Sequence, residues 1–418
     1  MPRFARKYLW WIIPLILVVL AAVWLLIGVT APQQKAGQPG AAGVLQAKVT
    51  GVPECPADLS GILTAPLMDP QYIAGLIPLG NINPPSHTSP VDHVYFDTAY
   101  TGKIPLYAPA DARIMSMTEI LYQNDAGEYE PSDFVLSFTV CRGLILDLAG
   151  YTGITPQLRA ELDKAKPDCI YGVKKEGHDK IQGQCHYQVD IPVTAGQELG
   201  YTQVEVKQGQ LALPFEIWAA NYNVPARADV NWDFYRDDRY AHIMCLFDLY
   251  AGDLKDQYYE KFGYYNANQK PGQTGEAVFI PRTVEPRCGQ VNQDLPGTIQ
   301  GMWYAGTDAE RNLEAQGKGL AFVHNNIDPT MAEVSIGGFI RDPMQFLYPP
   351  RHTGLIDRDP SEITADGQVY CFDTGRGYSG EDGIVLVQLV DDHHLLVEYQ
   401  PGDCTGGEQF IAPAEYQR

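Results

Sequence analysis

The sequence predicts a mainly β fold preceded by one transmembrane helix. Short runs of β-branched and aromatic residues, separated by turn-forming residues, recur through most of the chain after residue 58. The 40 glycines and 31 prolines supply the breaks between these runs. An uncharged apolar run stands before them, near the amino terminus. A length of 418 residues predicts more than one domain, and we expect two β regions joined by a connecting segment.

The apolar run, Tyr8–Val29, is long enough to cross the hydrocarbon core of a membrane as a helix. Three basic residues precede it, which predicts a cytoplasmic tail of residues 1–7 and an extracytoplasmic bulk. A cleaved signal peptide is the alternative, but the run exceeds the usual apolar region of such a peptide. Residues 30–58 begin with an Ala-, Gly-, Gln- and Pro-rich stretch and are expected to form a flexible tether. The expected location is the cell membrane, with a single pass.

Charge and cysteine content describe the part beyond this predicted anchor. The chain has 51 acidic and 30 basic residues, a net charge of −21, and every acidic residue follows Pro53. This balance argues against a nucleic-acid partner, because phosphate binding needs a basic face. All eight cysteines also follow the anchor, as expected in an oxidising compartment. Spacing alone does not give their connectivity, but proximity favours the pairs Cys169–Cys185 and Cys371–Cys404.

The first predicted β region covers residues 59–224. Its clearest strand candidates are Val94–Phe96, Ile104–Tyr107, Arg113–Met117, Phe134–Val140, Leu144–Leu148, Tyr187–Ile191 and Pro214–Ala219. The segment Pro156–Ala165 is a helical run, with Leu158 and Leu162 four residues apart. The segment Asp168–Tyr187 reads as a polar, Cys-containing loop. Many strands with one short helix predict an antiparallel sheet or sandwich.

A possible metal-binding cluster lies early in this region. His87, Asp92 and His93 fall within seven residues, and imidazole and carboxylate groups suit zinc. A catalytic zinc needs three protein ligands and an open position for water. The other histidines considered, His178, His186 and His242, are better explained by ordinary hydrogen bonding than by ligation.

Three segments resemble the lysostaphin-like (LytM-type) zinc endopeptidases of bacterial cell walls. Lys103–Ala112, KIPLYAPADA, is similar to a family segment reading roughly GTPVYAPADG, which follows a His-x-x-x-Asp ligand pair. Ala195–Gly200, AGQELG, and Phe215–Ile217, FEI, are similar to the later V-x-A-G-Q-x-I-G and H-x-H-F-E-I elements, in the same order. The resemblance implies a LytM-like antiparallel β-sheet domain over residues 59–224.

The chain departs from the family at its metal site. In the matching frame the two histidines of H-x-H fall on Ala212 and Pro214, whose side chains neither bind metal nor carry a proton. The family's further histidine would fall near Leu148–Gly150, where the sequence has none. His87 lies five residues before Asp92, whereas the family spacing is four.

The resemblance therefore implies a vestigial metal site, with His87, Asp92 and His93 as its remnants and no bound metal. The family builds its site from strands distant in sequence. We accordingly expect Pro105–Ala108 and Pro214–Ile217 to lie in the same sheet system. We also expect His87, Asp92, Ala212 and Pro214 to converge on one groove.

The rest of the chain predicts a connection and a second domain. Residues 225–287 form an aromatic connecting region, in which Phe247–Phe262 has helical spacing and a Tyr-rich face that we expect to pack against the neighbouring domain. Residues 288–418 predict a small all-β barrel or sandwich. Its strand candidates are Ile299–Tyr304, Gly319–Val323, Glu333–Ile336, Gln368–Phe372, Ile384–Leu389 and Leu395–Tyr399, with a hairpin loop at Val390–His394.

These expectations combine into a membrane-anchored extracytoplasmic protein with a catalytically degenerate peptidase-like domain. Its expected work is binding a cell-wall polymer or an envelope protein, without enzymatic turnover and without a cofactor. The membrane is contacted through residues 8–29. One alternative is an active zinc-dependent peptidoglycan endopeptidase with a rearranged metal site, and a second is a small-ligand carrier that uses the C-terminal β domain.

Overall fold

The computed structural model describes residues 51–174, 181–206, 211–226, 238–266, 278–305, 316–375 and 383–418. The fold is mainly β, with 46% strand and 10% helix, which confirms the predicted class. No helix within the described ranges is both long enough and apolar enough to span a membrane. The predicted tail, the predicted span Tyr8–Val29 and the tether as far as residue 50 lie outside these ranges.

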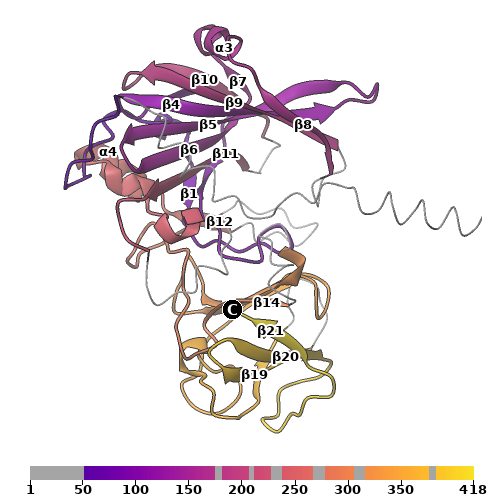
Figure 1. Cartoon of the computed structure of the whole chain (residues 1–418). Coiled ribbons are helices and arrows are strands. Elements are labelled where there is room, and N and C mark those ends of the chain that lie inside the picture. Colours follow the sequence, from indigo (N-terminus) through magenta and orange to yellow (C-terminus); the bar gives the residue numbers. More distant parts are fainter. Residues whose placement is uncertain are drawn as a thin grey trace, which may run out of the picture. The chain divides into compact units, whose positions relative to one another are not determined.

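The first β region is built on an eight-stranded antiparallel sheet in the order β1-β2-β11-β6-β5-β4-β9-β8 (Figure 1). Its strands are β1 (Gly75–Ile77), β2 (Val94–Thr98), β4 (Ala112–Gln123), β5 (Tyr129–Cys141), β6 (Leu144–Tyr151), β8 (Asp168–Lys174), β9 (Ile181–Val193) and β11 (Ala212–Asn221). A smaller sheet has the order β3-β10-β7 and consists of β3 (Gly102–Tyr107), β10 (Glu198–Val204) and β7 (Gly153–Ile154). All seven strand candidates of this region therefore lie within observed strands.

One expectation about this arrangement is wrong. Pro105 belongs to β3 and Phe215 belongs to β11, and these strands lie in different sheets. The reason is β10, which the sequence pattern did not reveal and which pairs with β3 along its whole length. Gly200 of β10 also accommodates the close approach of the Gly153 carbonyl on β7, where a Cβ atom would collide with it.

Local signals explain the first helix and the longest hairpin. Helix α3 (Pro156–Leu162) begins after Thr155, whose hydroxyl accepts a hydrogen bond from the Leu158 N–H at 3.4 Å. Leu158 and Leu162 bury the apolar side of α3 in the core. The turn between β4 and β5 is closed by Asn124, whose side-chain oxygen accepts from two backbone N–H groups.

The predicted connecting region packs into the core of the first β region. Its elements are η2 (Asp238–His242), η3 (Leu246–Leu249), α4 (Gly252–Tyr259), β12 (Gly263–Asn266) and β13 (Val278–Pro281). A further short helix, η1 (Pro70–Tyr72), belongs to the first β region itself. The expected helix Phe247–Phe262 is shorter than predicted, because η3 precedes α4. Phe247, Tyr250, Tyr258 and Phe262 are each 0% exposed and belong to one core with the large sheet. The Tyr-rich face is thus interior packing, as expected.

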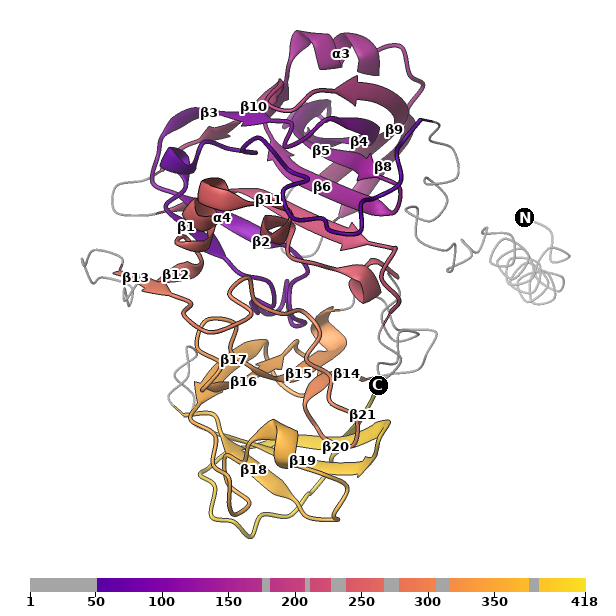
Figure 2. The ribbon, with the colours of Figure 1, turned by 90° about the vertical axis from the view of Figure 1, so that its left-hand side faces the viewer.

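The C-terminal region forms a second eight-stranded antiparallel sheet in the order β17-β16-β15-β14-β21-β20-β19-β18 (Figure 2). Its elements are β14 (Gly301–Ala305), η5 (Gln316–Lys318), β15 (Gly319–His324), β16 (Ala332–Ile336), β17 (Met344–Tyr348), η6 (Pro360–Glu362), β18 (Tyr370–Asp373), β19 (Ile384–Asp391), β20 (His394–Gln400) and β21 (Ala414–Gln417). The predicted hairpin loop joins β19 to β20, where the His393 N–H donates to Asp391.

This sheet curls around its own core. Tyr348 on edge strand β17 and Phe372 on edge strand β18 pack together with ring centroids 5.3 Å apart. The edges therefore turn toward each other, giving the half-barrel form. Trp303, Phe322 and Tyr416 are 0% exposed and fill the space between. The interior of the half-barrel is packed with side chains.

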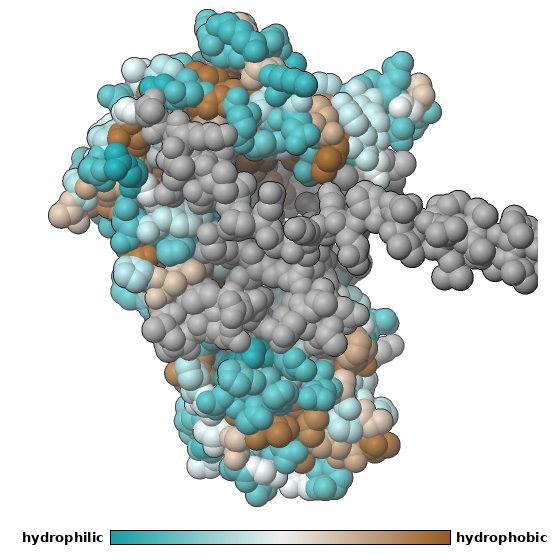
Figure 3. Space-filling model, in the orientation of Figure 1, coloured by the Kyte–Doolittle hydropathy of each residue, from teal (hydrophilic) through white to brown (hydrophobic). Residues whose placement is uncertain are grey.

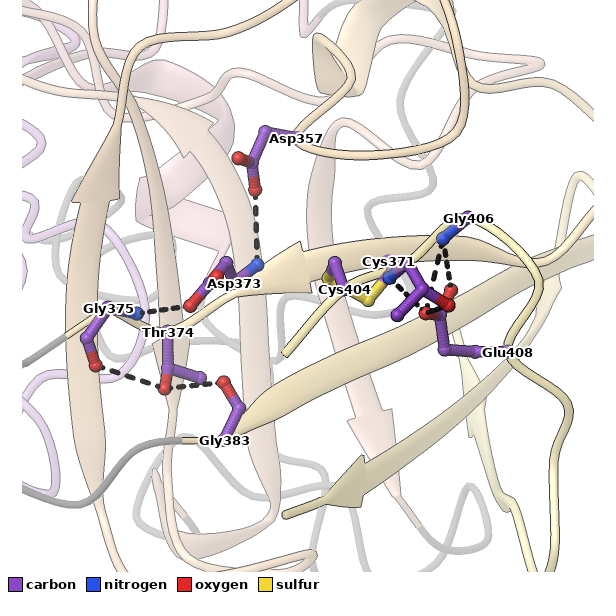
Figure 4. The surroundings of a disulfide bond; sticks show 10 residues. Asp357, Cys371, Asp373, Thr374, Gly375, Gly383, Cys404, Gly406 and Glu408 are labelled. Atoms are coloured by element: carbon purple, nitrogen blue, oxygen red, sulfur yellow. Dashed lines mark hydrogen bonds between the residues drawn. A yellow bond between two sulfur atoms is a disulfide. The ribbon is translucent and has the colours of Figure 1, made fainter. Parts of the chain in front are cut away.

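Four disulfides link all eight cysteines, and both predicted pairs are confirmed. They are Cys55–Cys141, Cys169–Cys185, Cys245–Cys288 and Cys371–Cys404. The Cys371–Cys404 bond ties β18 to the segment after β20 (Figure 4). The segment Asp168–Tyr187 is not the expected loop: β8 pairs with β9, and Cys169 stands directly opposite Cys185. The bond therefore links neighbouring strands of one ladder.

Candidate functional site

The large sheet has one apolar face and one polar face. Along β11, Phe215 and Ile217 enter the core, while the alternate residues Glu216 and Trp218 point to the opposite face and are only partly buried. The same alternation holds on β6, where Leu146 and Leu148 are core residues and Asp147 lies on the opposite side. We call this second side the polar face.

Strand register aligns the residues of the polar face into rows. One row reads Thr118, Val135, Ala149, Glu216 and Tyr95 across β4, β5, β6, β11 and β2. The next row reads Ser116, Ser137, Asp147 and Trp218. Small side chains lie in the middle of each row and large aromatic or charged ones lie toward β2. Together the rows form a band of side chains across β4, β5, β6, β11 and β2, which we call the polar lane.

A buried ionic cluster closes the β2 end of this lane. Asp92 is 5% exposed and its Oδ1 is 2.9 Å from His93 Nδ1. The indole N–H of Trp218 donates to the same oxygen at 2.9 Å. The guanidinium of Arg239, from η2, is 3.1 Å from Asp92 Oδ2 and 3.6 Å from Asp147. Burial alone would raise the pKa of Asp92, but the His93 hydrogen bond, the Arg239 charge and the Trp218 hydrogen bond together lower it.

The histidines of the predicted cluster lie close together beside this carboxylate. The His87 and His93 rings have centroids 5.7 Å apart. His87 Nε2 is 3.0 Å from the Tyr95 hydroxyl, and His93 Nε2 is 3.6 Å from Glu216. Burial, with Glu216 and Asp92 nearby, raises the pKa of Tyr95, so this phenol is neutral. His87, Asp92 and His93 thus lie close together, and each of them interacts with a protein group.

Ala212 and Pro214 lie elsewhere on the sheet. Ala212 pairs with Thr98, whereas Asp92 contacts Trp218, six residues further along β11. Six residues of extended chain span roughly 20 Å. The structure therefore differs from the expected single groove, because His87 and Asp92 lie at one end of β2 and Ala212 at the other.

The carboxylate closest to Pro214 along β2 is that of Asp97, whereas the prediction placed Asp92 beside Pro214. The register shift between Ala212 and Phe215 brings Pro214 to the level of Asp97 on β2. Asp97 is 5% exposed, and burial raises the pKa of its carboxyl to about 7. The signal was available in the sequence, because Asp97 follows His93 by four residues, the family spacing. His93 lies just before β2 and Asp97 lies within it, so nearly extended chain separates their Cα atoms by about 13 Å.

Aromatic side chains lie over Asp97, which follows Tyr95 by two residues on β2. Gly75 on β1 pairs with Asp97, and a Cβ atom on Gly75 would lie 3.3 Å or less from the rings of Tyr265 and Phe279. These rings belong to β12 and β13, and the Tyr265 hydroxyl donates to the Ala74 carbonyl at 3.2 Å. Asp97 is therefore enclosed, whereas Glu216 on the neighbouring strand β11 is partly exposed.

The remaining histidines named from the sequence have ordinary partners where they can be placed. His186 Nδ1 is 3.1 Å from the Thr118 hydroxyl, and His242 Nδ1 is 3.0 Å from the Val224 carbonyl. Burial lowers the pKa of His186. His178 lies outside the described residues. Among the described residues, no group of three or more His, Cys, Asp or Glu side chains has a geometry that could hold a metal ion.

The sequence pattern missed several members of this site. Trp218, Arg239 and Asp147 come from β11, η2 and β6, and only tertiary structure brings them to Asp92. Comparisons of the chain with family models, with curated proteins and with solved structures found no match.

Proposed function

We propose that this protein is a membrane-anchored extracytoplasmic binding protein that holds an extended envelope polymer without cleaving it. In this proposal residues 59–224 are a catalytically degenerate relative of the LytM-type endopeptidases. Residues 8–29 anchor the chain in the membrane. The polar lane across β4, β5, β6, β11 and β2 is the binding surface.

The place of Pro214 on β11, within the register shift that brings it level with Asp97 on β2, carries this proposal. In the family frame, Pro214 replaces a histidine that would stand beside a metal-binding aspartate, and here its neighbour across the strands is a buried carboxyl. A proline side chain offers no lone pair to a metal. In this proposal the carboxyl lacks the histidine that the family would place beside it, and the two positions lie on the paired strands β2 and β11.

The middle of the lane suits a polymer with hydroxyl and amide groups. The Glu216 side chain is 36% exposed, so its carboxylate is free to accept hydrogen bonds from a ligand. Ala149 lies opposite Glu216, and Val135 lies opposite Ala149, so only small side chains continue the row on that side of the carboxylate. Trp218 adds a partly buried aromatic surface at the end of that path, and aromatic residues are favoured in recognition.

Two observations argue against the alternatives. An active endopeptidase needs three side chains free to hold zinc, whereas Tyr95 already contacts His87, and Trp218 and Arg239 already contact Asp92. A carrier needs a hollow half-barrel, and Trp303, Phe322 and Tyr416 fill that interior.

Co-sedimentation with insoluble cell-wall polymer tests the proposal. The full chain, purified in detergent, should pellet with the polymer and release no soluble peptides from it. Glu216→Gln should weaken pelleting about tenfold, because a charge-assisted hydrogen bond is worth roughly 1.5–3 kcal/mol. Glu161→Gln on α3 is the matched control, since Glu161 pairs with Lys164 away from the lane.

Zinc analysis of the same preparation tests the absence of catalysis. We expect less than one zinc per chain by elemental analysis. Stoichiometric zinc that disappears in His87→Ala, together with release of cross-link peptides, would establish the endopeptidase instead.

A further inference from the structure

A polar cavity of about 340 Å³ lies outside the lane, between the segment that follows β13 and the second sheet. Its walls come from three stretches: residues 282–286, residues 290–300 and the loop after β15. Its volume falls within the usual range for small-molecule pockets. Side chains with amide or charged groups form most of the wall, among them Arg282, Glu285, Asp294 and Gln300.

Arg282 is a buried cation in this wall that makes no direct ion pair with any described residue, although the charge of Glu285 acts on it. It is 4% exposed, and its guanidinium donates to the carbonyls of Pro286 at 2.8 Å and Asn326 at 2.7 Å. Neither hydrogen bond supplies a negative charge, and Nη2 has no hydrogen bond to the described residues. A buried charge is costly unless it is paired. An anionic group in the cavity would supply the missing partner, and a guanidinium matches a carboxylate in shape.

Within the described part of the chain, Gln300 lacks a hydrogen-bond donor for its side-chain oxygen. Its Nε2 donates to the Gln293 carbonyl at 2.8 Å, which fixes the orientation of the amide. Its Oε1 is buried and accepts no hydrogen bond from the described residues. An unsatisfied buried acceptor destabilises the fold, and a donor in the cavity would remove that cost. Asp294 and Glu285 lie in the same wall, so a positively charged donor is favoured there.

The wall is held rigidly. The Gln293 side chain both donates to the His324 carbonyl and accepts from the His324 N–H, each at 2.9 Å. The His324 ring is 3.2 Å from Asp359. The disulfide Cys245–Cys288 lies just before the loop that carries Gln293. A rigid wall lowers the entropy cost of binding a small ligand.

We propose that this cavity binds a small zwitterion of the amino-acid class, with its carboxylate on Arg282 and its ammonium group near Gln300 and Asp294. The carboxylate of such a molecule would pair with the Arg282 guanidinium, and its ammonium group would donate to the Gln300 side-chain oxygen. The acidic residues beside Arg282 argue against a polyanion. This site is independent of the polar lane and of the function proposed for it.

Calorimetric titration of the full chain in detergent tests this site, with glutamine and serine as probes. Both should bind saturably. N-acetylglutamine, which lacks the ammonium group, and glutaminamide, which lacks the carboxylate, should each bind at least tenfold more weakly than glutamine. No saturable binding of either amino acid below about 10 mM would overturn the proposal. Equal binding of N-acetylglutamine would reduce the site to an anion site and would also overturn it.

Variants assign the two ends. Arg282→Gln should weaken glutamine binding at least about 30-fold, and Gln300→Leu about tenfold. The matched controls are Arg113→Gln, which removes an ion pair with Asp190, and Gln388→Leu, which removes a bond to Gly367. Both controls should bind glutamine normally. If Arg282→Gln does not fold, Gln300→Leu still decides, because unchanged binding in a folded Gln300→Leu protein contradicts the assignment.

Discussion

Replacing Asp97 by Asn should stabilise the protein at neutral and alkaline pH. Asp97 is 5% exposed, and burial raises the pKa of its carboxyl from 3.8 to about 7. One pKa unit corresponds to about 1.4 kcal/mol, so the shift amounts to about 4 kcal/mol. Asparagine has nearly the same shape and cannot ionise. It therefore avoids the cost of holding a carboxylate in this enclosure.

The stabilisation by Asp97→Asn should depend on pH. Between pH 3.8 and about 7 the folded state binds more protons at Asp97 than the unfolded state does. The free energy of unfolding of the natural protein therefore falls as the pH rises through this interval. Below pH 3.8 both states carry the protonated acid, and Asp97→Asn should have little effect. Above pH 7 the gain should reach its full value.

Urea unfolding of both proteins at pH 4, 6 and 8 measures this difference. Asp92→Asn is the internal control, because its neighbours lower the pKa of Asp92 in the folded protein. That variant should be destabilised at pH 8, by roughly 3–5 kcal/mol as for a broken buried ion pair. An Asp97→Asn gain that is equal at pH 4 and pH 8 would refute the argument, since it would not depend on ionisation.

Three further outcomes follow from other parts of the structure. Burial raises the pKa of Glu333 from 4.5 to about 7. Glu333→Gln should therefore raise the free energy of unfolding by about 3 kcal/mol at pH 8 and change it little below pH 4.5. Urea titrations at both pH values check this. The double variant Cys169→Ala and Cys185→Ala should lower the free energy of unfolding by roughly 3 kcal/mol in the same assay, since the bond closes a short loop, and an unchanged value would contradict the chain-entropy account. Trp218→Phe should cost about 1.5–3 kcal/mol, because Asp92 loses a hydrogen-bond donor; an equal cost in the Asp92→Asn background would show that the bond is not responsible.

The pattern of residues predicted the long central strands well. The segment Phe134–Val140 and the mostly apolar segment Leu144–Leu148 are long enough to identify β5 and β6. Burial of such residues in a sheet is favourable, so the local pattern and the fold agree. The pair Cys169–Cys185 was also predictable, because a short separation limits the partners that each sulfur can reach. The class of the fold and two of the four disulfides came from signals of this local kind.

Strands whose identity depends on a partner were missed. β8 carries Asp168, Gly172 and Lys174, residues that read as a loop, and only its ladder with β9 makes it a strand. β10 was missed for a similar reason, and it decides that β3 leaves the large sheet. Arg239 reaches Asp92 across well over a hundred residues of sequence, so no local pattern could assign it to the site.

The chemistry of His93 explains why this cluster supports a structural role better than catalysis. A general base must present a free nitrogen to the proton that it removes. His93 is 6% exposed, its Nδ1 is engaged by Asp92, and its Nε2 faces Glu216 at 3.6 Å. The arrangement stabilises the junction of β2 and β11 and leaves the exposed Glu216 side chain as the group in the lane most available to a ligand.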